Sequence, residues 1–279
     1  MQHRTSGRTA LVFPLVLFCL ALPRGAAAQD CEHSADRSAT GSMSGVERVH
    51  VIAGSGSLEV TGRAGATALT ARGRACASER GDLEDLRLDV RREGSTLVLE
   101  AMYPEDRHEF GNYYARIDLD VDVPQGAAVY IEDGSGNLTF RGTGATRVSD
   151  GSGELRGSDI RGALVVEDGS GNIDLNGVAG SIDIDDGSGD IEIEEARGAV
   201  EIDDGSGEIR VRSAESVRVS DGSGEIRLAS ITGNVTVDED GSGSIRVEGV
   251  GGNFTVDDAG SGDVSYRDVS GRVSIPDDD

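Results

Sequence analysis

The chain has 279 residues, of which 51 are acidic and 26 are basic, giving a formal net charge of −25. It has no Trp, five Tyr and five Phe, so the aromatic mass of one large ordinary core or of a helical bundle is missing. The acidic balance argues against nucleic acid and against docking on an anionic membrane surface, because both partners require clustered basic side chains.

The first 28 residues have the features of a secretory signal peptide. Arg4 and Arg8 precede an apolar run, Ala10 to Leu22, that is too short to span a bilayer as a helix. Ala28 then supplies a small residue for cleavage before Gln29. We therefore expect an exported protein, periplasmic, cell-surface or extracellular, with no membrane insertion after cleavage. A retained N-terminal anchor helix is the alternative.

Cleavage at that point leaves Cys31 and Cys76 as the two cysteines of the exported chain. An even number of cysteines in an oxidising compartment predicts one disulfide between them. Two free thiols are the alternative. Neither cysteine is expected to be catalytic, because no His or other base lies near it in the sequence.

The region before the repeats divides into two parts. Residues 29–46 are polar and predict a flexible lead. Residues 47–132 predict a β-rich N-terminal cap that is continuous with the repeats. Within the cap we expect a helical turn at 82–86, a hairpin over 86–99 and a strand over 117–123 that ends at Pro124.

A repeated turn sequence organises the rest of the chain. The tetrapeptide Asp-Gly-Ser-Gly recurs at intervals near 18 residues, and an altered copy begins at Ala259. The seven regular copies begin at Asp133, Asp150, Asp168, Asp186, Asp204, Asp221 and Asp240. Such a period is typical of a solenoid, since each unit is too small to bury its own apolar face.

One unit illustrates the predicted coil. After Asp168-Gly-Ser-Gly, Ile173 and Leu175 alternate with polar residues, and Ile182 and Ile184 do the same before the next turn. Alternation with period 2 places these side chains on one face of a strand. We therefore predict an all-β fold, a parallel β-solenoid of about eight coils over 133–279, with two short strands in each coil of about 18 residues.

Three features together resemble a known family. They are Gly54-Ser55-Gly56 before a strand, the alternating run from Ile117 to Pro124, and the repeated Gly-Ser-Gly followed by alternating apolar residues. The pattern is similar to the bacterial putative-adhesin β-strand-repeat family of unknown function, related to the autotransporter-adhesin head type of β-helix. The resemblance covers residues 47–276 and implies a secreted or envelope-associated β-helix.

The acidic residues of the turns allow two interpretations. Stacking of the coils would place the seven Asp residues in a column, with further acids before and after them along one edge of the solenoid. Each Asp can accept a hydrogen bond from the N–H two residues later and so cap its turn. Alternatively, the column Asp133, Asp150, Asp168, Asp186, Asp204, Asp221 and Asp240 binds Ca²⁺ between coils through hard oxygen ligands.

Basic residues on the predicted outer face also fall into register. Arg210, Arg227 and Arg246 form one column, and Glu192 is expected beside Arg210. Likewise, Glu201 is expected beside Arg218. The Arg column is either a solvated face or a site for a sulfated or acidic glycan.

The sequence shows no arrangement of residues that is typical of a catalytic site. His3 lies in the predicted signal peptide, and His33, His50 and His108 have no metal-ligand spacing. The Ser residues of the turns have no base arranged to activate them. We expect no catalytic residues and no cofactor apart from the Ca²⁺ alternative.

The predicted function is a monomeric, non-catalytic, adhesin-like binding or structural module with an unidentified protein or glycan ligand. The alternatives are a Ca²⁺-stabilised rod with a structural or sensory role, and a glycan-active enzyme.

Overall fold

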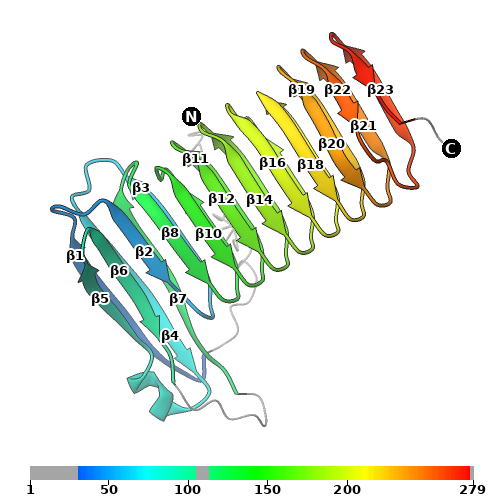
Figure 1. Ribbon diagram of the computed structural model, residues 1–279. Coiled ribbons are helices and arrows are strands. Elements are labelled where there is room, and N and C mark those ends of the chain that lie inside the picture. Colours follow the sequence, from blue (N-terminus) through cyan, green and yellow to red (C-terminus); the bar gives the residue numbers. More distant parts are fainter. Residues whose placement is uncertain (1–30, 105–112, 277–279) are drawn as a thin grey trace, which may run out of the picture. The chain divides into compact units, whose positions relative to one another are not determined.

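The computed structural model describes residues 31–104 and 113–276. The predicted signal peptide and His108 lie outside the described residues. Two twelve-stranded sheets, called sheet A and sheet B here, run along the molecule with their strands stacked side by side (Figure 1). The predicted parallel β-solenoid of about 18 residues per coil is confirmed.

In spatial order, sheet A consists of β1 (His33–Ser42), β4 (Ala68–Ala77), β7 (Ala115–Pro124), β3 (Leu58–Arg63), β9 (Leu138–Arg141), β11 (Leu155–Ile160), β13 (Ile173–Val178), β15 (Ile191–Glu194), β17 (Ile209–Ala214), β19 (Ile226–Ile231), β21 (Ile245–Val250) and β23 (Val264–Val269). Sheet B consists of β24 (Val273–Ser274), β22 (Phe254–Val256), β20 (Val235–Asp240), β18 (Ser216–Asp221), β16 (Ala199–Asp204), β14 (Ile182–Asp186), β12 (Leu164–Asp168), β10 (Thr146–Asp150), β8 (Ala128–Asp133), β2 (Arg48–Ile52), β6 (Thr96–Met102) and β5 (Arg87–Glu93).

From β8 onward, every coil contributes one strand to each sheet, and equivalent residues pair in parallel. For example, Ile182 of β14 pairs with Val200 of β16, and Ile191 of β15 pairs with Ile209 of β17. The apolar residues of both sheets face each other and are almost fully buried, whereas alternate residues such as Asp183 are exposed. Each buried Ile or Val contributes roughly 1.5–3 kcal/mol, so a stack of coils gains what one coil cannot.

The Gly-Ser-Gly turns stack directly on one another. The N–H of Gly187 donates to Asp168 O at 3.0 Å, and the N–H of Gly189 donates to Ser206 O at 2.9 Å. Gly207 shows why the last position must be glycine. Its φ is +153°, and a Cβ there would lie 1.7 Å from the carbonyl oxygen of Gly189 in the preceding coil. The repeated glycine therefore permits the close stacking of turns.

The cap is built from an unexpected strand order. The coil formed by β2 and β3 lies between β8 and β9 on one side and β6 and β7 on the other, although β6 and β7 come later in the chain than β3. Ser55 bridges Ser135, so Gly54-Ser55-Gly56 stacks as a degenerate coil. The predicted hairpin is present as the antiparallel pair β5 and β6. The helical turn predicted at 82–86 lies two residues earlier, as the 3₁₀ helix η1 (Arg80–Glu84).

The predicted flexible lead over 29–46 is wrong for most of its length. Residues His33–Ser42 form β1, which pairs antiparallel with β4 over ten residues. Backbone hydrogen bonds hold this edge strand, so its polar side chains do not prevent it from ordering. The Arg37 guanidinium also donates to the carbonyl oxygens of Leu83 and Leu86 and ties β1 to the segment that contains η1.

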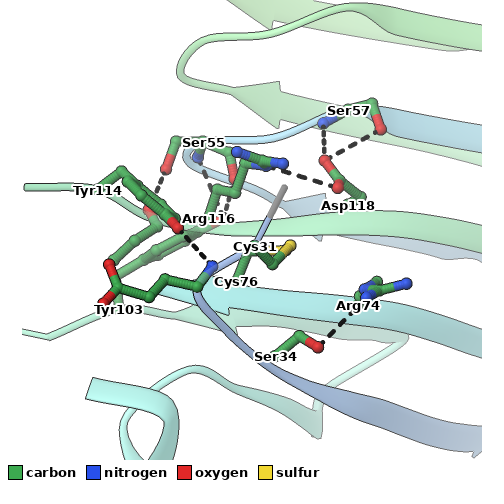
Figure 2. A network of polar contacts seen from close by, with 12 residues as sticks. Cys31, Ser34, Ser55, Ser57, Arg74, Cys76, Tyr103, Tyr114, Arg116 and Asp118 are labelled. Atoms are coloured by element: carbon green, nitrogen blue, oxygen red, sulfur yellow. Dashed lines mark hydrogen bonds and ion pairs between the residues drawn. A yellow bond between two sulfur atoms is a disulfide. The ribbon is translucent and has the colours of Figure 1, made fainter. Parts of the chain in front are cut away.

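A disulfide and a polar network fasten this end of the molecule. Cys31 and Cys76 are bonded, with their Cα atoms 5.4 Å apart. Figure 2 shows the nearby network, in which the Tyr103 hydroxyl accepts the N–H of Ser55 at 3.1 Å. The same hydroxyl accepts the N–H of Gly54, also at 3.1 Å. Asp118 accepts the Ser57 N–H at 3.1 Å. Side-chain contacts thus close the cap where the regular turn sequence is missing.

Candidate functional site

The first Asp of each repeated turn faces the interior of the solenoid. We call Asp133, Asp150, Asp168, Asp186, Asp204, Asp221 and Asp240 the Asp column; their exposed fractions range from 0% to 7%. Along β14, Ile182, Ile184 and Asp186 are buried in alternation with exposed residues. The strand register stacks these residues in one column, as expected, and their side chains point inward because the alternation along each strand continues to the Asp.

The capping interpretation of these residues is confirmed for the central coils. Asp186 Oδ1 accepts the N–H of Ser188 at 3.2 Å, and Asp221 Oδ1 accepts the N–H of Ser223 at 2.9 Å. Asp168 and Asp204 make the same contact with the Ser two residues later. One carboxyl oxygen of each residue therefore closes an Asx turn.

Burial changes the protonation of the Asp column. Desolvation, followed by the charges of Asp168 and Asp204, raises the pKa of Asp186 to about 7. Desolvation together with the charge of Asp150 raises the pKa of Asp133 to about 7. The pKa values of Asp150 and Asp221 rise to about 6, again chiefly through desolvation. Desolvation also raises the pKa values of Asp168, Asp204 and Asp240.

The geometry offers no cage for a metal ion. Within residues 31–104 and 113–276, no group of three or more His, Cys, Asp or Glu side chains is arranged to hold one. The column is a single row, so each stretch between coils presents carboxyl oxygens from one side only, whereas Ca²⁺ takes six to eight oxygen ligands. The Ca²⁺ ladder stays a prediction.

The acids that flank the Asp column lie outside. Asp185, which precedes Asp186, is exposed, and so is Asp190, which follows the same turn. The net negative charge of the repeats is therefore divided between an internal row and an external surface. Only the external residues meet solvent and partners directly.

The basic residues gather on the outer face of sheet A. Glu192 lies beside Arg210 in the strand register, and Glu201 beside Arg218 in sheet B, as expected. The ion pairs differ from this simple pairing: Arg210 binds Glu208, and Arg218 binds Asp238 at 2.5 Å. Arg210 therefore turns to a glutamate two residues earlier in its own coil, whereas Arg218 reaches diagonally past its direct neighbour Thr236.

Two glutamates connect the Arg column into one ladder. Glu208 binds both Arg210 and Arg227, and Glu225 binds both Arg227 and Arg246. Each glutamate follows a Gly-Ser-Gly turn, so the turn sequence and the Arg column are joined coil by coil. This alternation fixes the guanidinium groups in place along the axis of the solenoid.

A groove of about 450 Å³ runs between this column and the next outward column of sheet A. We call it the Arg groove; its charged lining is Arg210, Arg212, Arg227, Arg246, Arg267, Glu192, Glu194 and Glu248. Ala229 interrupts the second column, where its methyl group leaves room between Arg212 and Glu248. In a chain with a net charge of −25, this surface has five Arg and three Glu.

Sequence reasoning located the Arg column but missed the groove. The signal was Ala229, a small residue at a position where neighbouring coils carry Arg212 and Glu248. It also missed Tyr266, which is 50% exposed on the last strand of sheet A and packs its ring against Phe254. Tyr266 occupies the inward slot that Leu228 and Val247 fill in earlier coils.

The described histidines take structural positions. His50 Nε2 lies 3.0 Å from Glu132 Oε1, and its ring stacks on Tyr130 at 4.5 Å between centroids. His33 begins β1, opposite Ala77. No helix in the described part of the chain is long and apolar enough to cross a membrane.

Comparison with known proteins identifies a family for this chain and solved structures with a similar fold. The family model described as Toastrack DUF4097 matches residues 41–220. A search of curated proteins gives no match. A solved structure described as a putative adhesin from Parabacteroides distasonis is 15% identical, has a TM-score of 0.51, and covers 87% of this chain and 97% of its own.

Two further solved structures are more distant in shape. One, described as a putative lipid binding protein from Parabacteroides distasonis, is 18% identical with a TM-score of 0.49, over 87% of this chain and 97% of its own. The other, described as a putative cell adhesion protein from Clostridium sporogenes, is 12% identical with a TM-score of 0.32, over 88% and 100%. At these identities a likeness concerns the fold alone.

Proposed function

This chain belongs to the Toastrack DUF4097 family, whose model matches more than half of its residues, and on that premise we propose that it is a non-catalytic, adhesin-like binding module of the cell envelope. The names of the similar structures, adhesins and a lipid binding protein, describe binding proteins and not enzymes. His50 contacts Glu132 and stacks on Tyr130, a packed position that supports the same choice.

Export is the first part of the proposal. The signal-peptide features of residues 1–28 support it, as does the bond between Cys31 and Cys76, since disulfides persist in oxidising compartments. Mass spectrometry of the exported protein should find an N-terminal peptide that begins at Gln29. A mature chain that keeps residues 1–28 would contradict cleavage and favour an anchored form.

The Arg groove is the proposed binding surface, and an acidic glycan is its proposed ligand. The single observation that carries this choice is a groove lined by five Arg residues on an otherwise acidic protein. A guanidinium presents five N–H donors in a planar fork, so an Arg that binds Glu208 or Glu225 keeps further donors for a ligand.

The spacing of the groove suits a linear chain. Strands in successive coils lie about 4.8 Å apart, so a polymer laid along the axis meets one Arg of the column per coil. Glu192 in the lining of the groove is exposed and presents carboxylate oxygens, which complement the hydroxyl groups of sugars. The acidic surface elsewhere repels a polyanion that binds without selectivity, so binding should concentrate in the groove.

Calorimetric titration with polygalacturonate, dextran sulfate and neutral dextran tests this proposal. The expected result is binding of an acidic polysaccharide, weakened by salt, and little binding of dextran. The double variant Arg227→Gln/Arg246→Gln should lower the affinity at least tenfold, a difference of about 1.4 kcal/mol. Its melting temperature should change little, because exposed ion pairs contribute about 0–1 kcal/mol each.

The matched control, which also removes two charges, is Arg147→Gln/Arg218→Gln on β10 and β18 of sheet B, where Arg218 pairs with Asp238. Arg147 is also exposed and paired with a glutamate, Glu167, but it lies on sheet B, away from the groove. The control should bind as the unmodified protein does. An equal loss of affinity in both variants would mean that net charge alone explains the binding. If no acidic polysaccharide binds, the proposal of an acidic glycan as the ligand is refuted.

A further inference from the structure

The Asp column contains buried oxygens that have no hydrogen-bond partner. In every one of its seven residues, Oδ2 is buried and unpartnered, although the side chains are at most 7% exposed. An unpaired buried acceptor destabilises a fold, and an unpaired buried charge destabilises it more. A row of such atoms at successive coils therefore requires a ligand.

The surroundings of the column contain no cation that could serve. The charged groups that act on its members are other acids. Asp residues of adjacent coils act on Asp133, Asp150, Asp186 and Asp221, whereas Asp190 and Asp203 act on Asp204, and Asp258 acts on Asp240. At the other end, Asp133 acts on the Tyr103 phenol. Across the interior, sheet A contributes aliphatic side chains such as Ile191. Among the described residues, no Arg or His faces the column.

We propose that the Asp column is a proton-binding site, in which neighbouring carboxyl groups share protons between coils near neutral pH. A protonated carboxyl gains an O–H donor, and the carboxylate one coil away presents an acceptor. Strands about 4.8 Å apart make the equivalent carboxyl groups direct neighbours, and side-chain rotation within the column brings two of their oxygens to the roughly 2.5–3.0 Å that an O–H···O bond needs. A bound proton removes a buried charge and gives the orphaned oxygens partners at the same time.

The consequence for stability has a definite sign. A carboxyl whose pKa is higher in the folded state than in the unfolded state binds more protons when folded. Its stabilising contribution is complete below the unfolded value, about 3.9, and is lost as the pH rises through the folded value. For Asp186 and Asp133 the folded pKa is about 7, so their contribution should fall between about pH 4 and pH 7.

The test measures thermal unfolding and proton release with the exported protein. Unfolding at pH 6 should release more than one proton, counted by calorimetry in two buffers that differ in ionisation enthalpy. Each proton held only by the folded state changes the unfolding constant by up to tenfold per pH unit. Asp186→Asn mimics the protonated side chain, so it should raise the melting temperature at pH 8, leave it nearly unchanged at pH 4.5 and reduce the number of protons released.

Asp185→Asn is the matched control. It removes the same charge one residue away, from an exposed side chain, so its effect should be small and proton release should not change. Asp221→Asn provides an independent member of the column if the first variant folds poorly. Unfolding of the unmodified protein without proton release at pH 6 would overturn the proposal. Ca²⁺ in place of protons would also overturn it: the ion would then raise the melting temperature far more than Mg²⁺ at pH 8, and Asp186→Asn would abolish that rise.

Discussion

The N-terminal cap and the repeated coils use the same two sheets but are held together differently. In the coils, parallel strands, stacked glycine turns and a buried Asp column repeat with little change from β8 to β21. In the cap, β1, β4 and β5 run antiparallel to their neighbours, and a disulfide and the Tyr103 contacts replace the regular turn. The backbone stacks the coils, whereas specific side chains hold the cap.

We therefore expect the stability of the coils to depend mainly on the backbone, and the stability of the cap to depend mainly on particular side chains. A coil tolerates variation at its exposed positions but has no room for a Cβ in its turn. The cap has glycine positions with free space around them, but it depends on single side chains such as Tyr103. Adding a Cβ to a turn glycine should therefore lower stability more in the coils, whereas removing a single polar group should lower stability more in the cap.

The largest effect is expected at the stacked turns. In Gly207→Ala, the new Cβ would lie 1.7 Å from the Gly189 carbonyl oxygen, so neighbouring coils must separate. We expect a loss of more than about 4 kcal/mol in the free energy of unfolding, measured by urea denaturation, or failure to fold. The cap control, Gly94→Ala, has a φ of +62° but no atom within 4 Å, and should lose only about 1–2 kcal/mol. Similar losses at both positions would contradict the contrast between the regions.

The next effect concerns the disulfide of the cap. Replacing both cysteines in Cys31→Ser/Cys76→Ser opens a link across 45 residues and should lower stability by about 4 kcal/mol in the chain-entropy model. Hydrogen exchange should rise in β1 and β4 and change little in β14 to β19. A uniform rise along the whole solenoid would mean that the cap and the coils unfold as one unit.

A smaller effect is expected from the Tyr103 hydroxyl. Tyr103→Phe keeps the ring but leaves the N–H groups of Gly54 and Ser55 without their acceptor. A loss of about 1–3 kcal/mol should follow, seen as a lower midpoint in urea. Tyr266→Phe is a suitable control, because that side chain is half exposed at the other end of sheet A. A control loss as large as that of Tyr103→Phe would refute the capping role.

The smallest effect should come from divalent cations. Thermal unfolding followed by circular dichroism in EDTA, Ca²⁺ and Mg²⁺ at matched ionic strength should give equal, small rises for the two ions, because screening of the exposed acids does not distinguish them. A Ca²⁺-specific rise would revive the predicted ladder at Asp133 to Asp240 as a metal site.

The repeated coils could be predicted from the sequence because each unit repeats the same pattern of alternating apolar residues and a Gly-Ser-Gly turn. Alternation in Ile182 and Ile184 fixes the inward face, and the Gly-Ser-Gly turn fixes the coil length. The cap could not be derived in this way. β1 is polar and has no apolar alternation, and the placement of β2 and β3 between later strands depends on long-range pairing that no local pattern reveals.

The same distinction applies to the sites. Arg210, Arg227 and Arg246 could be aligned by counting along the repeat, but the groove depends on Ala229 in the adjacent column. The Asp column could also be aligned by counting along the repeat. The turn-cap and Ca²⁺ interpretations both left its burial out, although strand alternation continues through the Asp residues and points them inward.

The most direct measurement is infrared spectroscopy of the exported protein across pH 5 to 8.5, which detects the carbonyl band of protonated carboxyl groups. Carboxyl groups with ordinary pKa values near 4 are ionised over most of this range. We predict a band that persists at pH 6, disappears by pH 8.5 and weakens in Asp186→Asn but not in Asp185→Asn. Absence of the band at pH 6 would mean that the Asp column is ionised, and would contradict its place in the interior as a proton-binding site.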